Sequence, residues 1–194
     1  LQTEAARLAI EDAGLKREDI DGTIQCNLSG GRMHANDWVD AFPRVLGLPT
    51  KFYFNIYRGG VTTALSIVAA SQFLELGLAK YVLVAFGTNV RSKRVMGETR
   101  ADVWGEPLGD LTAVSHHTFF ACRHMHEYGT TSRQLGAIAV AQRAWACKNP
   151  HAAMYGRPIT IEDHQNSRWV VWPYHLLDIC LVSDGGTAFI ITTT

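Results

Sequence analysis

The sequence has little of what marks several large classes of protein. Its 18 Lys and Arg balance 18 Asp and Glu, so it carries no net charge. It therefore offers no overall field of the kind that draws a protein to nucleic acid or to an anionic membrane. Its four cysteines lack the short paired spacing of a disulfide framework, and the chain opens with no charged-then-apolar signal segment. These absences favour a cytoplasmic protein without a nucleic acid partner.

Long apolar runs are also missing. A membrane-spanning helix needs about 18 uninterrupted apolar residues, and Gln72 and Glu75 interrupt the longest apolar segment. Of the 194 residues, 47% are hydrophobic and 19% are charged, which is enough to bury a proper core. We expect one globular domain without a membrane span.

Helical and strand patterns alternate along the chain, which predicts an α/β fold. The expected helices cover residues 1–13, 38–46 (broken by Pro43), 61–76, 114–128 and 132–146, with a capped helix start at 160–163. The expected strands cover residues 23–26, the aromatic segment 51–55, the apolar segment that ends near Asn89, and 187–192. The polar, Gly-rich stretch after Asn89 indicates an insertion inside the domain, at about residues 90–170.

The most informative segment runs from Lys51 to Asn89, where an aromatic strand, a glycine pair, an apolar helix and a second apolar strand follow one another. Gly59 and Gly60 permit a tight turn and leave helix amide hydrogens open toward an anion or a thioester oxygen. Alternatively, the pair only makes room for close packing of the helix on the strand. A glycine pair alone does not separate the two interpretations.

Four segments, in the same order along the chain, resemble the thiolase superfamily, especially its sterol-carrier or lipid-transfer branch. They are the opening LQTEAARLAIEDAGLKREDIDGTIQC, the segment NIYRGGVTTALSIVAA with the following FLELGLAKYVLVAFGTN, the central RHMHEYGTTSRQLGAIAVAQRAWACKNPHA, and the closing LLDICLVSDGGTAFIITT. The resemblance covers nearly the whole chain. It implies that residues 1–194 are the N-terminal half of a layered thiolase-like α/β fold, with a substrate-loop insertion at about 90–170, and that the ligand is an acyl-CoA.

One position departs from the family. Thiolases place a nucleophilic cysteine on the strand-to-helix turn, where the helix N-terminus favours the thiolate. Aligned through the letters TTAL, that position is Arg58 here, or Gly59 if the register slips by one. Neither residue can form an acyl-enzyme. The cysteines of the chain all lie elsewhere, at Cys26, Cys122, Cys147 and Cys180.

The resemblance further implies that the chain is a fragment or half of an assembly. The strand expected before Leu1 is absent, as are the acid-base histidine and second cysteine of the family's second half. A sheet without its neighbouring strand and covering half leaves apolar surface and strand edges exposed. Family members pair through the sheet edge near the nucleophile strand, so we expect a homo-oligomer with a contact at Lys51 to Asn55.

Other residues could complete a site. By resemblance, His116 and His117 lie in the loop that contacts the acyl thioester, although a packing role is the alternative. The Tyr57 hydroxyl lies beside the turn and could act as an acid or base if buried. The run RSKR, from Arg91 to Arg94, is either a solvated loop or a clamp for coenzyme A phosphates.

Two further groups are given structural interpretations. Cys122 and His126 are four residues apart on an expected helix, but no third ligand is evident, so we expect no metal site. Asp184, Gly185 and Gly186 predict a turn that returns the last strand to the sheet, with glycine at positive φ.

Two functions follow as alternatives. The first is retro-aldol carbon-carbon cleavage of a coenzyme A thioester, by an enzyme of the acyltransferase or aldolase (lyase) class that works without a cysteine nucleophile. Such a reaction needs a general base and stabilisation of an enolate oxygen, for which the amides after Gly59 are suited. The second is a non-catalytic acyl-CoA-binding or scaffold subunit, paired with an active thiolase-like chain or with a zinc-ribbon and oligonucleotide-fold (OB-fold) protein. The expected substrate-binding residues are Tyr57, Arg58, Gly59, Gly60, His116 and His117, with no cofactor beyond the thioester substrate.

Overall fold

The computed structural model describes residues 1–26, 41–92, 105–109 and 112–193. Contacts within the chain divide it into two units. Unit 1 comprises Leu1–Met96 and Val182–Thr194, and unit 2 comprises Gly97–Leu181. Unit 2 is therefore inserted between two segments of unit 1.

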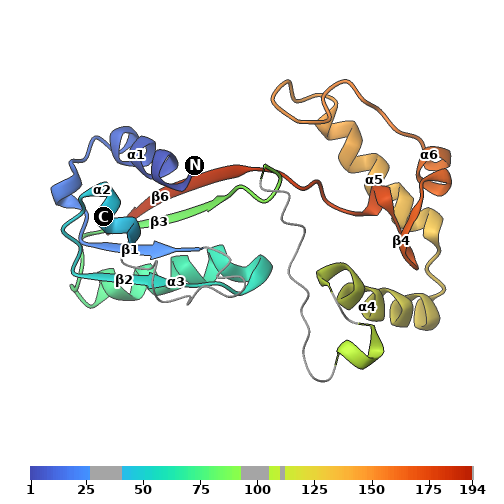
Figure 1. Cartoon of the computed structure of the whole chain (residues 1–194), viewed down its shortest axis with the longest axis horizontal. Coiled ribbons are helices and arrows are strands. Elements are labelled where there is room, and N and C mark those ends of the chain that lie inside the picture. The colour runs from blue at the N-terminus through green and yellow to red at the C-terminus, as the bar shows by residue number, and fades with distance from the viewer. Residues whose placement is uncertain (27–40, 93–104, 110–111, 194) are drawn as a thin grey trace. The chain divides into compact units, whose positions relative to one another are not determined.

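A four-stranded mixed sheet forms the middle layer of unit 1 (Figure 1). Its strands are β1 (Gly22–Gln25), β2 (Phe52–Asn55), β3 (Tyr81–Thr88) and β6 (Gly185–Thr192), in the order β2-β1-β3-β6. β1 is parallel to both β2 and β3, whereas β6 is antiparallel to β3. The carboxyl ends of β1, β2 and β3 consequently meet at one end of the sheet.

One face of the sheet is covered by α1 (Gln2–Asp12) and α2 (Ala41–Leu46) (Figure 1). Ala6 and Ile10 of α1 are one turn apart, as its helical pattern requires, and they share a buried core cluster with Leu83 of β3. The predicted first helix and the apolar strand before Asn89 are thus confirmed.

The prediction that Pro43 breaks the second helix was wrong. The structure has Pro43 buried inside α2, which continues to Leu46 instead of breaking. Pro43 lies in the first turn of α2, where a missing backbone N–H costs no helical hydrogen bond. Residues 38–40 of the predicted helix lie outside the described residues.

The opposite face of the sheet is covered by α3 (Thr62–Glu75), which matches the predicted apolar helix. α3 meets the sheet through a narrow row of buried residues spaced by four. These residues are Thr62, Ser66, Ala70 and Leu74. The last two belong to a core cluster that includes Val82 and Val84 of β3.

The outward side of α3 is apolar as well. Val61, Leu65, Ile67 and Val68 are 40–55% exposed, and residues 61–74 contain no charged side chain. A helix that is apolar on every side is typical of a helix covered on both sides.

Unit 2 is a helical unit with a small hairpin (Figure 1). Its elements are α4 (Ala113–Tyr128), α5 (Ser132–Ala146), α6 (Ile161–Asn166), β4 (Trp169–Val171) and β5 (Tyr174–His175). The predicted helix start at Thr160 is confirmed, because the Thr160 hydroxyl caps α6 by accepting from the Asp163 N–H. The hairpin was missed, since strands of three and two residues are too short to show a period-2 pattern.

Within the described ranges, no helix has both the length and the apolarity that crossing a membrane would take.

Candidate functional site

The predicted site lies where β2 leads into α3. After β2 the chain passes Tyr57 and Arg58 and makes a 3₁₀ turn at Gly59–Val61 before α3 begins. The turn follows the carboxyl end of a parallel strand, which is where open α/β sheets bind their ligands. The amide N–H groups of the turn also have no acceptor within the helix, because the first N–H groups of any helix lack one. The turn can therefore donate to a carbonyl oxygen or an anion.

Gly59 and Gly60 do not serve close packing against any residue that the structure describes. A Cβ atom added to either glycine would meet no atom of the described residues within 4 Å. Gly59 has φ of +57°, in the left-handed region that side chains disfavour, whereas Gly60 does not. Of the two interpretations of the glycine pair, the structure favours the open turn over the tight helix-strand contact.

Arg58, one of the two positions predicted to match the thiolase nucleophile, is exposed at the start of the turn. Its backbone N–H donates to Thr62 Oγ1 at 2.8 Å, and the same hydroxyl donates to the Gly59 carbonyl at 2.8 Å. Sequence reasoning used Thr62 only as an alignment mark. The signal that could have found it is a hydroxyl residue four positions after Arg58, at the start of an apolar helix.

Cys26, at the end of β1, lies close to this turn but cannot replace the missing nucleophile. Its side chain is buried, and Sγ is 3.1 Å from Ser66 Oγ of α3. Burial raises the pKa of the Cys26 thiol above its ordinary value of 9.0. At neutral pH the group is therefore a buried thiol and not a thiolate.

His116 and His117 belong to α4 of unit 2, whereas the turn from Tyr57 to Gly60 belongs to unit 1. The structure thus describes the two parts of the predicted site separately. The His116 and His117 rings lie near the Phe120 ring, at centroid distances of 5.4 and 6.3 Å. The Tyr174 hydroxyl donates to the His117 carbonyl at 3.4 Å. Burial, with the nearby Asp178 and Cys122, raises the pKa of Tyr174 above its ordinary value of 10.0.

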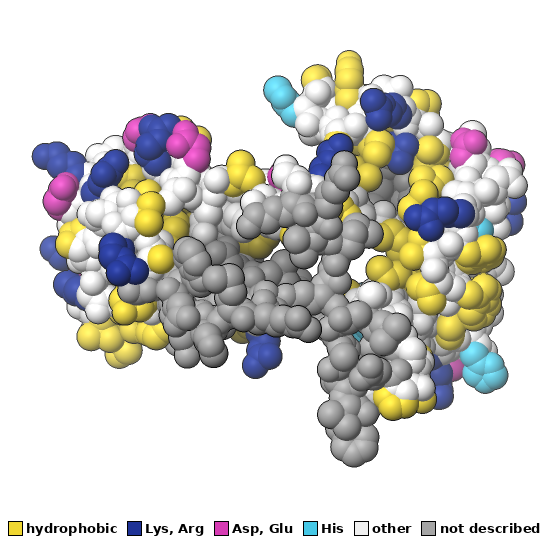
Figure 2. Space-filling model, in the orientation of Figure 1, with side chains coloured by type: hydrophobic (Ala, Val, Ile, Leu, Met, Phe, Trp, Pro, Cys, Tyr) yellow, Lys and Arg dark blue, Asp and Glu magenta, His cyan; other side chains and the backbone are white. Residues whose placement is uncertain are grey.

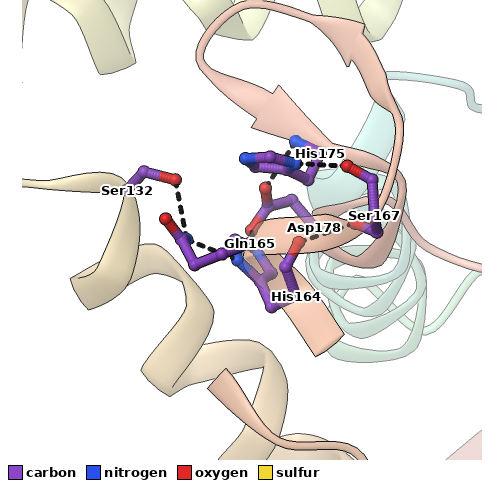
Figure 3. A network of polar contacts seen from close by, with 6 residues as sticks. All are labelled: Ser132, His164, Gln165, Ser167, His175 and Asp178. Atoms are coloured by element: carbon purple, nitrogen blue, oxygen red, sulfur yellow. Dashed lines mark hydrogen bonds and ion pairs between the residues drawn. The ribbon is translucent and has the colours of Figure 1, made fainter. Parts of the chain in front are cut away.

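Unit 2 also contains a buried polar network that the sequence did not reveal (Figure 3). His164 is fully buried, and its Nε2 lies 2.7 Å from Asp178 Oδ1. Asp178 Oδ2 accepts the His175 N–H at 2.7 Å, and His175 Nδ1 lies 2.6 Å from the Ser167 carbonyl. The Gln165 side-chain amide extends the network to Ser132 of α5, at 3.0 Å. The network joins α5, α6 and the hairpin, so we assign it to the architecture of unit 2.

The closing Asp-Gly-Gly segment differs from its prediction. Neither Gly185 nor Gly186 has a positive φ, and both already belong to β6. Gly186 is needed instead for close approach, because a Cβ there would lie 2.8 Å from the Leu1 carbonyl oxygen. Asp184 accepts hydrogen bonds from the Ser92 hydroxyl and from the N–H groups of Ser92 and Arg91, and these bonds hold its pKa below the ordinary 3.8.

The remaining candidates give little. Lys93 and Arg94 of the predicted RSKR clamp lie outside the described residues. Among the residues that the structure describes, no cluster of three or more His, Cys, Asp or Glu side chains could hold a metal ion.

Comparison with known proteins shows which proteins this chain is related to. No protein-family model matches the chain. The chain is 36% identical to the 17-hydroxy-3-oxo-4-pregnene-20-carboxyl-CoA lyase of Mycobacterium tuberculosis, over 100% of its own length and 52% of the relative's. It is 32% identical to the acetyl-CoA acetyltransferase of Methanothermobacter thermautotrophicus, over 97% of its length and 50% of the relative's.

A solved structure described as "Ltp2-ChsH2(DUF35) aldolase" superimposes with a TM-score of 0.84 at 37% identity, covering 100% of this chain and 50% of that one. The chain spans about half the length of the curated relatives it matches. The chain is thus related to thiolase-like proteins and has a thiolase-like α/β fold.

Proposed function

We propose that the chain is the N-terminal half of a thiolase-like protein of the sterol-carrier or lipid-transfer branch, and that this protein cleaves a carbon-carbon bond in a coenzyme A thioester without a cysteine nucleophile. The observation that carries the proposal is the turn after β2, whose amide groups are open to a ligand. We propose that Arg58, or Gly59 if the register slips by one, stands where thiolases have their nucleophile. Relatives described as a carboxyl-CoA lyase and an aldolase support the same chemistry.

The reaction proposed is a retro-aldol cleavage of a β-hydroxyacyl thioester. A base removes the proton of the β-hydroxyl group, a carbonyl forms there, and the bond between Cα and Cβ breaks. Its electron pair passes into an enolate of the thioester, which is then protonated at Cα. The oxygen of this enolate carries the developing charge, and preorganised N–H donors at the turn would stabilise it.

The chain supplies the binding turn in this scheme, with Tyr57, Arg58, Gly59 and Gly60 in unit 1. His116 and His117 of unit 2 remain proposed contacts of the substrate loop. The base would come from a second half or a partner chain, since Cys26 is buried and uncharged. No cofactor is required beyond the thioester itself.

Partners are proposed on two observations. β2 is an edge strand of the sheet within the described residues, and its Tyr53 and Phe54 are 46% and 42% exposed, which supports a homo-oligomer formed through Lys51 to Asn55. The solved aldolase names ChsH2(DUF35) beside Ltp2, which supports a second protein partner. We propose that this partner is of the zinc-ribbon and OB-fold kind. We place the assembly in the cytoplasm.

A non-catalytic acyl-CoA-binding or scaffold subunit is the alternative. It is favoured by the described part of the site, which offers amide donors and a cation but no nucleophile. Isothermal titration of the full-length protein with acetyl-CoA and a bulky acyl-CoA, beside an assay for carbon-carbon cleavage, separates the two. Binding with turnover supports the lyase, binding without turnover supports the scaffold, and absence of binding contradicts both.

A further inference from the structure

Two hydroxyl side chains occupy the row of α3 that faces the sheet. Thr62 and Ser66 are 7% and 0% exposed, and the next two members of the row are Ala70 and Leu74. Burying a hydroxyl group costs free energy unless it forms hydrogen bonds, so two of them in this buried row need an explanation. Both are hydrogen-bonded, and their bonds lead to the turn.

Thr62 bonds to both sides of the turn. Its Oγ1 accepts the Arg58 N–H at 2.8 Å, and its hydroxyl hydrogen goes to the Gly59 carbonyl at 2.8 Å. A hydroxyl group has only one hydrogen, so this single donor is committed to Gly59. The first bond holds the peptide between Tyr57 and Arg58, and the second holds the peptide between Gly59 and Gly60.

Ser66 links Thr62 to the sheet by further hydrogen bonds. The Ser66 hydroxyl donates to the Thr62 carbonyl at 2.9 Å. Cys26 Sγ lies 3.1 Å from Ser66 Oγ. Because the only hydrogen of Ser66 is directed at Thr62, the Cys26 thiol is the donor to Ser66. Cys26, Ser66 and Thr62 therefore form a buried line of hydrogen bonds from the end of β1 to the turn.

We propose that Thr62 is a positioning residue for the thioester carbonyl. This inference rests on the function proposed above. Thr62 satisfies the Arg58 N–H and the Gly59 carbonyl, so the amide groups of Gly59, Gly60 and Val61 are the ones left for a ligand. The line to Ser66 and Cys26 holds Thr62 itself, so these amides need little rearrangement when the carbonyl binds. A rigid donor set is the condition under which such donors discriminate a carbonyl oxygen.

The test compares acetyl-CoA with S-ethyl-CoA, which lacks only the thioester carbonyl. Both are titrated calorimetrically into the full-length protein and its Thr62→Val and Thr62→Ser variants. We expect the wild type to prefer acetyl-CoA by about tenfold, which corresponds to about 1.4 kcal/mol. Thr62→Val should lose this preference with S-ethyl-CoA affinity unchanged, and Thr62→Ser, which keeps the hydroxyl, should retain it.

Thr63→Val is the matched control, because Thr63 is exposed on the same helix one residue later. It should leave the preference unchanged. Ser66→Ala is a second variant should Thr62→Val not fold, and it should lower the preference by about threefold through the line to Thr62.

Retention of the preference in Thr62→Val, or in Ser66→Ala where Thr62→Val does not fold, overturns the inference. An equal loss of affinity for both ligands also overturns it, since a purely structural role would weaken both alike. If the wild type binds the two ligands equally, Thr62 positions no carbonyl donor and only coenzyme A binding stands. If the wild type binds neither, the proposed function falls and the positioning role falls with it.

Discussion

Gly59 and Gly60 are neighbours with the same side chain and different requirements. Gly59 has a left-handed backbone, and Gly60 does not. We expect Gly59→Ala to destabilise the protein by about 1 kcal/mol, because a Cβ in this region meets the following carbonyl oxygen. Gly60→Ala should change the free energy of unfolding by less than about 0.5 kcal/mol, since open space surrounds its Cβ position. Urea unfolding measures both, and equal losses would contradict the assignment.

Arg58 gives the second prediction at this scale. If its guanidinium group contacts a coenzyme A thioester, Arg58→Ala should weaken binding by about 1–3 kcal/mol, the range for a charge-assisted hydrogen bond. Titration of the full-length variant with acetyl-CoA measures this. An unchanged affinity would place the side chain outside the site. Arg58→Cys tests the alignment, because acylation of the new thiol by acetyl-CoA would confirm that Arg58 occupies the nucleophile position.

At the scale of single residues, the sequence located the turn but not the side chains that hold it by hydrogen bonds. Gly59 and Arg58 stand in a recognisable local pattern of strand, turn and helix. The partners of Thr62 and Cys26 depend on how β1 and α3 pack across the sheet, which no local pattern records. The pairing of His164 with Asp178, fourteen residues apart, was missed for the same reason.

At the scale of elements, the network around Asp178 holds the parts of unit 2 together. Its carboxylate is bonded to His164 Nε2 and to the His175 N–H. Asp178→Asn would turn an NH₂ group toward one of these two donors. We expect a loss of about 2–4 kcal/mol in the free energy of unfolding, measured by urea.

Glu162→Gln is the control for this change. It removes an exposed ion pair between Glu162 and Arg133, which is worth less than about 1 kcal/mol. If the two variants lose similar stability, the network around Asp178 is not an anchor of unit 2.

Asp21 joins three strands of unit 1 and gives the pH prediction. Burial raises the pKa of Asp21, but hydrogen bonds from the Lys51 side chain and from the N–H groups of Lys80 and Tyr81 outweigh it, so the pKa lies below the ordinary 3.8. A depressed pKa stabilises the fold above pH 3.8, and the contribution disappears as pH falls through the folded-state value.

Asp21→Asn should therefore be less stable than the wild type at pH 7, by about 1–2 kcal/mol. The difference should shrink steadily below pH 3.8. Urea midpoints across this range measure it. A difference that stays constant with pH would show that the carboxylate charge plays no part.

The sequence predicted the long elements well, because their apolar periodicity is strong. α3 and the strands on either side of it were found from pattern alone. The hairpin β4-β5 was not, since strands of three and two residues show no periodicity and the burial of His175 and of Pro173, between the strands, depends on the tertiary fold. Pro43 was misjudged because its effect depends on its position within the helix turn.

At the scale of the whole molecule, the exposed apolar surface predicts a further contact. Hydrophobic side chains gather on the visible face of unit 2 (Figure 2), and the outward side of α3 in unit 1 is uncharged. We expect a second half of the protein to cover α3. In the full-length protein, Val68→Asp should then cost about 2–3 kcal/mol, because it would bury an unpaired carboxylate.

Val45→Asp is the comparison, since Val45 is 73% exposed on α2 at the other face of the sheet. It should change stability by less than about 0.5 kcal/mol. Thermal unfolding of the two full-length variants measures the contrast. A neutral Val68→Asp would show that α3 faces solvent.

The insertion of unit 2 between β3 and β6 also has a consequence during synthesis. β6 pairs with β3 along its whole length, from Tyr81 with Thr192 to Thr88 with Gly185, yet unit 2 separates the two strands in the chain. A ribosome that adds about 5–20 residues each second emits β6 roughly 5–20 s after β3. Until then β3 is the edge strand of the nascent sheet, and α1 lacks one of the two strands against which it packs. A chaperone that shields this strand edge should therefore engage the nascent chain while unit 2 is being made.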